Sequence, residues 1–198
     1  MNLVERAKNI IITPKTEWEA VANEEPNIQQ ILMGYVFPLA LIPTIATIVG
    51  WGVIGIFGFT SFSYGIAMGL VQLINAFLSV VIAGFVIDAL AGSFGSTKNL
   101  GRAVQLVAYS MTPIWIAGIL NILPSISWLS FLLSLYSIAL IYQGITPLMK
   151  TPEDKKVVYM IISIVVIIAV YWIISLILTA ILLAIFGLSL LSAMTTAY

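Results

Sequence analysis

Long stretches without a charged residue dominate this sequence. Three such runs extend over Pro26–Ile87, Ala103–Met149 and Val157–Tyr198. A helix that crosses the hydrocarbon core of a bilayer needs about 20 mostly apolar residues. The first two runs are each long enough for two crossings and a turn, and the third is long enough for one crossing and a tail. The pattern therefore predicts an all-α protein, a polytopic membrane helical bundle of five transmembrane helices.

Turn-forming residues place the boundaries of these helices. Gly, Ser and Thr residues predict turns at 58–64 and 92–101, and Pro147 is expected to stop the fourth helix. Thr151 is expected to cap the fifth helix, with Pro152 as its first residue. The expected helices are Ile31–Phe57, Gly65–Ala91, Arg102–Ile122, Ile126–Thr146 and Asp154–Phe186.

The chain divides into an N-terminal segment, residues 1–30, and a transmembrane domain, residues 31–198. Within the segment, Leu3, Val4, Ala7, Ile10 and Ile11 recur at helical spacing, opposite a face of Asn2, Glu5, Arg6, Lys8 and Asn9. This pattern predicts a short amphipathic helix in the membrane interface. We interpret it as a membrane anchor, and the alternative is a docking face for a cytoplasmic protein.

A second short helix is expected to follow the first. Thr13-Pro14 is typical of a helix start, because Pro is favoured at the first helical position. This helix would carry Trp18 near the level where aromatic belts lie in membrane proteins.

Composition agrees with a membrane protein and narrows the chemistry. Hydrophobic residues make up 61% of the chain and charged residues only 8%, against about 25% charged in soluble domains. The chain has no Cys and no His, which excludes disulfides, thiolate nucleophiles and Cys/His metal sites. No catalytic motif stands out, and the net charge of zero does not favour nucleic acid. We therefore expect no enzyme activity, catalytic residue, cofactor or metal.

The basic residues predict the orientation. All eight precede the first helix or lie between helices two and three or four and five, which places them on one side of the membrane. Because Lys and Arg concentrate in cytoplasmic loops, the N-terminus is expected in the cytoplasm and the C-terminus outside.

One acidic residue, Asp88, lies within an expected span. An ionisable group in a span is a functional hypothesis by default. Asp88 lies close to the expected loop, however, within plausible reach of Lys98 or Arg102. We interpret this cluster as an ion pair at the membrane edge, and the alternative is proton or ion handling.

Uncharged polar residues form stripes on two of the expected helices. Gln72 and Asn75, with Ser79, share one face of the second helix, and Gln105, Tyr109 and Thr112 share one face of the third. Because polar side chains seldom face lipid, both stripes are expected to point into the bundle. A polar cavity would form if they met there.

Small residues and prolines predict how the helices pack. A seam of Ser127, Ser130, Ser134 and Ser137 follows one face of the fourth helix, and Gly65 and Gly69 open the second. Small residues let helix backbones approach closely, within this chain or with another membrane protein or a second copy. The alternative for the serines is a hydroxyl-lined pathway. Pro38 and Pro43 are expected to bend or open the first helix.

Four short motifs resemble the Yip family, the Ypt/Rab-interacting membrane proteins. They are Thr13-Pro14-Lys15-Thr16-Glu17-Trp18-Glu19, Tyr35-Val36-Phe37-Pro38-Leu39, Ile87-Asp88-Ala89-Leu90-Ala91-Gly92-Ser93-Phe94-Gly95 and Ala108-Tyr109-Ser110-Met111-Thr112-Pro113. The resemblance implies five spans with a cytoplasmic N-terminus. The short N-terminal region, and Gly34 before Tyr35, resemble prokaryotic members.

Two functions remain open at this level. The first is a non-enzymatic scaffold or adaptor in the prokaryotic inner membrane, with the lipid bilayer as its environment. The second is a small transporter or channel for an ion or polar solute, which would use Asp88, the polar stripes and the proline-bent first helix.

Overall fold

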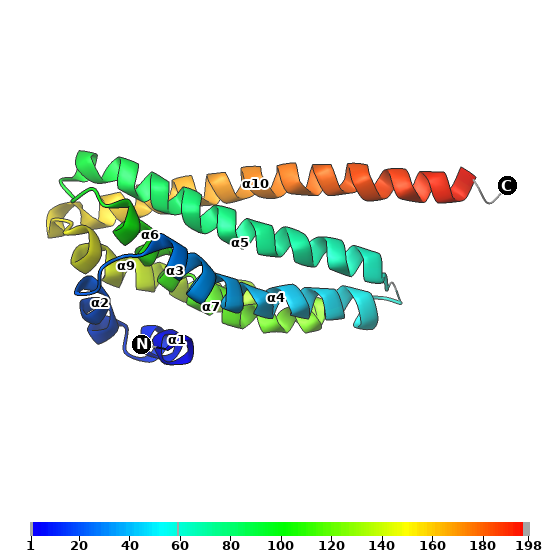
Figure 1. The fold of residues 1–198 in the computed structure, drawn as a ribbon, viewed down its shortest axis with the longest axis horizontal. Coiled ribbons are helices and arrows are strands. Elements are labelled where there is room, and N and C mark those ends of the chain that lie inside the picture. The colour runs from blue at the N-terminus through cyan, green and yellow to red at the C-terminus, as the bar shows by residue number, and fades with distance from the viewer. Residues whose placement is uncertain (1, 59, 196–198) are drawn as a thin grey trace.

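Five helices that are long and apolar enough to cross a membrane form an elongated bundle in the computed structural model (Figure 1). The structure describes residues 2–58 and 60–195, without the side chains of 182, 183 and 185–195. The candidate spans are Ile28–Ile54, Phe62–Phe94, Leu100–Ile122, Leu129–Met149 and Glu153–Ile181. The predicted all-α class and the predicted count of five are confirmed, with the helix ends shifted by a few residues.

Two short helices precede the spans, as the sequence predicts. Helix α1 (Leu3–Ile12) begins at Asn2, whose side chain caps its first turn. Helix α2 (Pro14–Ala22) begins at the predicted residue. The hydroxyl of Thr13 donates to the last turn of α1, at the Asn9 carbonyl, instead of capping α2. Thr13 therefore joins the two helices as a tight corner.

Helix α1 lies along the flank of the bundle. It contacts α6 (Leu100–Ser110) and α7 (Thr112–Ala117) of the third span. The hydroxyl of Tyr136 in the fourth span donates to the Ile11 carbonyl at 2.9 Å. The N-terminal helices are therefore part of the packed structure, while the depth of α1 in a bilayer stays a prediction.

The first span contains two π-helical segments, whose turns are wider than those of an α-helix. Its parts are α3 (Ile28–Ile31), the π-helix η1 (Leu32–Val36), α4 (Phe37–Val49) and the π-helix η2 (Gly50–Ile54). The Phe37 amide donates to the carbonyl five residues back, at Leu32, where an α-helix would use four. This turn directly precedes Pro38, which has no amide proton to donate. The predicted opening at Pro38 is confirmed, whereas α4 continues through Pro43.

The second span packs on the first through glycines. It consists of α5 (Phe62–Ala91) and the short 3-10 helix η3 (Gly92–Phe94). A Cβ atom at Gly65 would lie 2.8 Å from the Ile48 carbonyl oxygen, and one at Gly69 would lie 2.6 Å from Ile48 Cγ1. Only hydrogen fits at these two positions, so the predicted close packing is confirmed.

The third span is the most enclosed of the five. Its α6 and α7 are separated by a break at Met111, just before Pro113, and the 3-10 helix η4 (Gly118–Ile122) follows. In its most apolar window 72% of the residues are buried, the largest share among the spans. The first, second and fourth spans therefore pack around this helix.

The fourth span differs from the sequence expectation. The expected single helix Ile126–Thr146 is divided into η5 (Pro124–Ile126), α8 (Leu129–Ser134) and α9 (Tyr136–Met149). The expectation that Pro147 stops the helix is wrong. A proline removes only one backbone donor, and α9 continues to Met149 and ends at Lys150, which adopts a left-handed conformation with φ 51°.

The predicted cap of the fifth helix is also wrong. Helix α10 (Glu153–Thr195) begins one residue after Pro152, which was expected as its first residue. The Thr151 hydroxyl donates to the Ile145 carbonyl at 3.3 Å and accepts from Ser96 at 2.9 Å. Thr151 therefore joins the two loops at this end of the bundle.

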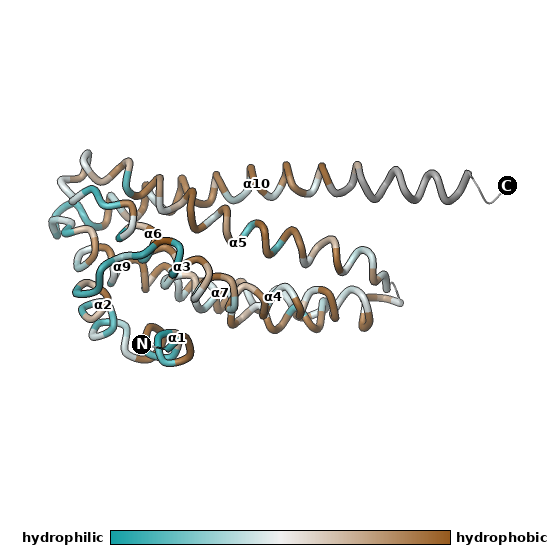
Figure 2. The backbone as a smooth tube through the Cα atoms, in the orientation of Figure 1, coloured by the Kyte–Doolittle hydropathy of each residue, from teal (hydrophilic) through white to brown (hydrophobic). Residues whose placement is uncertain are grey.

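Helix α10 is the longest element and forms the most exposed of the five spans. Its 43 residues extend about 65 Å at 1.5 Å per residue, roughly twice the ~30 Å hydrocarbon core. It runs past the end of α5 (Figure 1), and only 6% of its most apolar window is buried. The apolar colour of the part of α10 that Figure 2 does not draw in grey fits a helix that faces lipid.

The segments that carry all eight Lys and Arg residues gather at one end of the bundle. The Thr97 amide donates to the Met149 carbonyl at 2.8 Å, which joins the two basic loops. Arg102 donates to the Val21 carbonyl at 2.7 Å, which joins the first of these loops to α2. The predicted sharing of one side is confirmed.

We expect Gly65→Ala to destabilise the bundle. The added methyl group would force α4 and α5 apart, at a cost of about 1–3 kcal/mol. Thermal unfolding of the purified protein in detergent would show a lower Tm. Gly34→Ala is the matched control, because the nearest atom to its new Cβ would be Gln30 Cγ at 3.9 Å. Equal Tm values for both variants would contradict the close contact.

Candidate functional site

A buried ion pair holds the two N-terminal helices together. The guanidinium of Arg6 on α1 donates to Glu17 on α2 at 2.7 Å, and a second donor of the same group bonds Glu24. The Arg6 and Glu17 side chains are only 7% and 6% exposed, whereas that of Glu24 is 43% exposed. Sequence reasoning placed Arg6 on the solvent face of α1, and the structure corrects this.

The charge of Arg6 is compensated locally. Burial alone would lower the pKa of Arg6, but the hydrogen bond to Glu24 and the neighbouring negative groups raise it overall. Arg6 therefore stays a cation. A buried charge needs partners of this kind, because removing one leaves an uncompensated charge away from water.

Aromatic rings from three elements form a cluster beside this ion pair. The Arg6 guanidinium carbon lies 5.3 Å from the ring centre of Tyr109 in the third span. Tyr35 of the first span meets Tyr109 edge-on at 4.7 Å, and Trp18 of α2 lies 6.3 Å away. Arg6 therefore contacts the carboxylates of Glu17 and Glu24 as well as the aromatic ring of Tyr109.

A chain of hydroxyl groups ties the first span to the third. The Thr112 hydroxyl donates to the Tyr109 carbonyl at 2.6 Å. Because that bond uses the only hydroxyl proton of Thr112, its 2.6 Å contact with the Tyr35 hydroxyl has Tyr35 as the donor. Two of the predicted polar residues are thus structural partners at the Arg6 cluster.

The side chain of Trp18 lies in the core of the structure. It is 1% exposed, and a Cβ atom at Gly144 would lie 2.7 Å from its Cε2. The expected level of Trp18 near the membrane interface stays a prediction. The ring fills space that the missing side chain of Gly144 leaves on α9, which docks α2 on the fourth span.

A polar cleft opens beside the cluster. Its volume is about 320 Å³, and both charged and amide side chains line it. The lining residues include Arg6, Glu24, Glu25, Asn27, Gln30, Tyr35, Gln105 and Tyr109. The cleft lies between the N-terminal helices and the first and third spans, so it belongs to the same cluster.

The predicted ion pair of Asp88 with Lys98 or Arg102 is not formed among the described residues. Arg102 instead bonds Val21 and Gln105, the latter at 3.2 Å. The Asp88 Oδ1 atom is buried and has no hydrogen-bond partner in the described part of the chain. Asp88 therefore remains a carboxylate without the partner that the sequence suggested.

The two predicted polar stripes bond to different partners. Gln72 accepts from Thr47 of the first span at 2.7 Å, and Asn75 donates to Ser175 of the fifth span at 2.8 Å. Gln105 and Tyr109 belong to the Arg6 cluster instead. The stripes point inward as expected, and each fastens its helix to a neighbour.

The serine seam of the fourth span is used partly within this chain. The Ser130 hydroxyl donates to the Ala117 carbonyl of the third span at 2.9 Å, and Ser137 is buried. Ser127 and Ser134 bond carbonyls of their own segment, at Pro124 and Phe131. Contact with a second copy through this seam stays a prediction.

A family comparison matches most of the chain. The model of the Yip1 domain matches residues 8–175. The chain belongs to the Yip1 domain family. No curated protein and no solved structure matches it.

Three of the four Yip motifs meet at the Arg6 cluster. The first contributes Glu17 and Trp18, the second contributes Tyr35, and the last contributes Tyr109 and Thr112. The third lies elsewhere, where Tyr159 stacks on Phe94 at 5.0 Å. The segments that carry the family resemblance therefore form the junction between the N-terminal helices and the bundle.

Sequence reasoning missed Arg6, Glu17 and Glu24 as members of this site. A signal for Arg6 was present, since it lies four residues before the fully buried Ile10 and so on the same helical face. For Glu17 the corresponding signal was Val21, which lies four residues later and is fully buried. No metal-binding group of three or more His, Cys, Asp or Glu side chains was found among the residues that were searched.

We expect Arg6→Ala to release α1 and α2 from the bundle. The change leaves Glu17 buried without its cation, and breaking a buried pair costs about 3–5 kcal/mol. Limited proteolysis in detergent would show faster cleavage within residues 1–25, together with a lower Tm. Lys15→Ala, at an exposed position on α2, is the control and should change neither. Unchanged cleavage in Arg6→Ala would contradict the assigned role of Arg6.

Proposed function

We propose that this Yip family protein is a non-enzymatic membrane adaptor whose N-terminal helices present a fixed face to a cytoplasmic partner. The observation that carries the proposal is the Arg6 ion pair, which fastens α1 and α2 to the bundle. A segment that served only as a loose anchor would not need a buried charge with two carboxylate partners.

The outward face of α2 is available for contact. Glu17, Trp18 and Val21 are buried against the bundle, whereas Lys15, Thr16, Glu19 and Ala20 are exposed. The exposed set mixes both charges with small residues, which suits a protein surface better than the hydrocarbon core. Since Arg102 also donates to the end of α2, this face is held in one orientation.

The charge distribution supports the proposed orientation. The three segments with all eight basic residues share one end of the bundle, and Lys and Arg concentrate on the cytoplasmic side of membrane proteins. The adaptor face would then look into the cytoplasm.

Site-specific crosslinking in cells tests the adaptor function. A photoreactive benzoylphenylalanine in place of Thr16 is expected to trap one discrete protein. The same residue in place of Phe131, which is exposed on the fourth span, is the control. Arg6→Ala should abolish the Thr16 adduct, because the face is no longer held. Absence of a protein adduct at Thr16, or an identical one at Phe131, would refute the adaptor face.

A transporter is the second candidate, and Asp88 favours it. A carboxylate oxygen that is buried in a span and lacks a hydrogen-bond partner is the kind of group that marks an ion or proton pathway. If the protein transports a cation, proteoliposomes of the full chain should show flux, and Asp88→Asn should abolish it.

The matched control for this assay is Glu19→Gln, which neutralises an exposed carboxylate on α2. It should leave the flux unchanged. If proteoliposomes of the unaltered protein show no flux of H⁺, Na⁺ or K⁺, the transporter function is refuted for these ions.

A further inference from the structure

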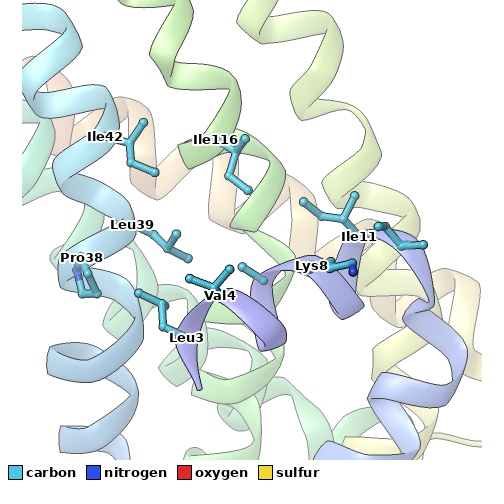
Figure 3. Close-up of a pocket in the computed structure, with 10 residues that line it drawn as sticks. Leu3, Val4, Lys8, Ile11, Pro38, Leu39, Ile42 and Ile116 are labelled. Carbon is cyan, nitrogen blue, oxygen red and sulfur yellow. The ribbon is translucent and has the colours of Figure 1, made fainter. Parts of the chain in front are cut away.

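An apolar groove separates α1 from the bundle. Its volume is about 530 Å³, within the range of small-molecule sites. Figure 3 shows Val4 and Ile11 of α1 on one side, and Leu39 and Ile42 of α4 with Ile116 of α7 on the other. Almost all of the exposed lining is carbon, so the groove suits a hydrocarbon chain.

The groove lies beside the spans and not beyond their ends. Ile42 is about 20 Å into the first span, which begins at Ile28 and extends about 40 Å in all. The hydrocarbon core is ~30 Å thick, so the Ile42 end of the groove lies at the level of lipid tails. Lipid acyl chains are the molecules that surround the protein at that level, so they can occupy an apolar groove there.

Helix α1 cannot close the groove by shifting inward. On one side the Arg6 guanidinium is held by Glu17 and Glu24, and at its C-terminal end Tyr136 donates to the Ile11 carbonyl. These contacts hold α1 to the segment of α2 and to the fourth span, and so limit how far α1 can move toward α4 and α7. The groove is therefore a feature of the folded chain.

One charge lies at the groove, and it is positive. Lys8 is the only ionisable residue in the lining, and it is exposed. No carboxylate in the described chain forms a salt bridge with it. The four-carbon stem of lysine lies along apolar surface while its ammonium reaches polar groups, as lysines do near lipid headgroups. The combination matches an amphiphile with an anionic head.

We infer that the groove binds an acyl chain of an anionic glycerophospholipid, with the headgroup phosphate at Lys8. The lipid comes from the leaflet on the N-terminal side of the bundle. This site is independent of the adaptor function, because it uses the α1 face opposite to Arg6 and none of the exposed face of α2.

Photoreactive lipids test the site on the full chain. The protein is placed in nanodiscs that contain phosphatidylglycerol or phosphatidylcholine with a diazirine in the acyl chain, and the labelled residues are mapped by mass spectrometry. We expect labelling of the segments around Leu39 and Ile116, about fivefold stronger with phosphatidylglycerol, the effect of one lysine near an anionic surface.

Two pairs of variants separate the groove from the general lipid surface. Lys8→Gln should remove the fivefold preference and leave the phosphatidylcholine signal unchanged, whereas Lys15→Gln should preserve the preference. Ile42→Trp should fill the groove and abolish labelling with both lipids. Ile45→Trp, at a 55% exposed position of the same helix outside the groove, should not.

Several results would overturn the inference. They are equal labelling by the two lipids, labelling spread evenly over the exposed spans, and full competition by a free fatty acid. If Ile42→Trp is misfolded by size-exclusion chromatography, the Lys8→Gln result alone decides, since Lys8 is exposed and its loss leaves the core intact.

Discussion

The guanidinium of Arg6 is a charge held away from water, and the arrangement of the N-terminal end follows from how that charge is compensated. Opposite charges must accompany a buried cation if it is to be tolerated. Glu17 and Glu24 fix α2 against α1, and the Tyr109 ring joins both helices to the third span. The ion pair is thus the point at which a polar N-terminal segment becomes part of an apolar bundle.

Inside the bundle, the close approach of helices stabilises the fold, as the burial of apolar surface does for proteins in water. Lipid tails are as apolar as leucine, so helices associate through packing and hydrogen bonds. Glycines allow this at Gly65 and Gly69 against α4, and at Gly144 against Trp18. The π-helix η1 in the first span complements these contacts. It accommodates Pro38 while the backbone stays helical.

The faces of helices α1 and α2 have different surroundings. The inward face of α1 carries Arg6 and joins the polar cluster, while its apolar side lines the groove with Leu39 and Ile42. The outward face of α2 is charged and exposed. A segment of about 20 residues therefore connects an apolar groove, a buried electrostatic junction and an exposed surface, which is why its attachment to the bundle matters for both proposals.

The sequence by itself determined the fold class, the number of spans, the side that the basic residues share and the glycine contacts of Gly65 and Gly69. These features follow from bilayer thickness and from local residue size, which a one-dimensional pattern records. Only the tertiary structure decided that Arg6 and Trp18 are buried, that Arg102 turns to α2 instead of Asp88, and that Tyr35 bonds Thr112 across 77 residues. A charge or hydroxyl group takes the partner that folding brings within about 3 Å. Which helices become neighbours is a property of the packed bundle, and the spacing of residues along the chain does not contain it.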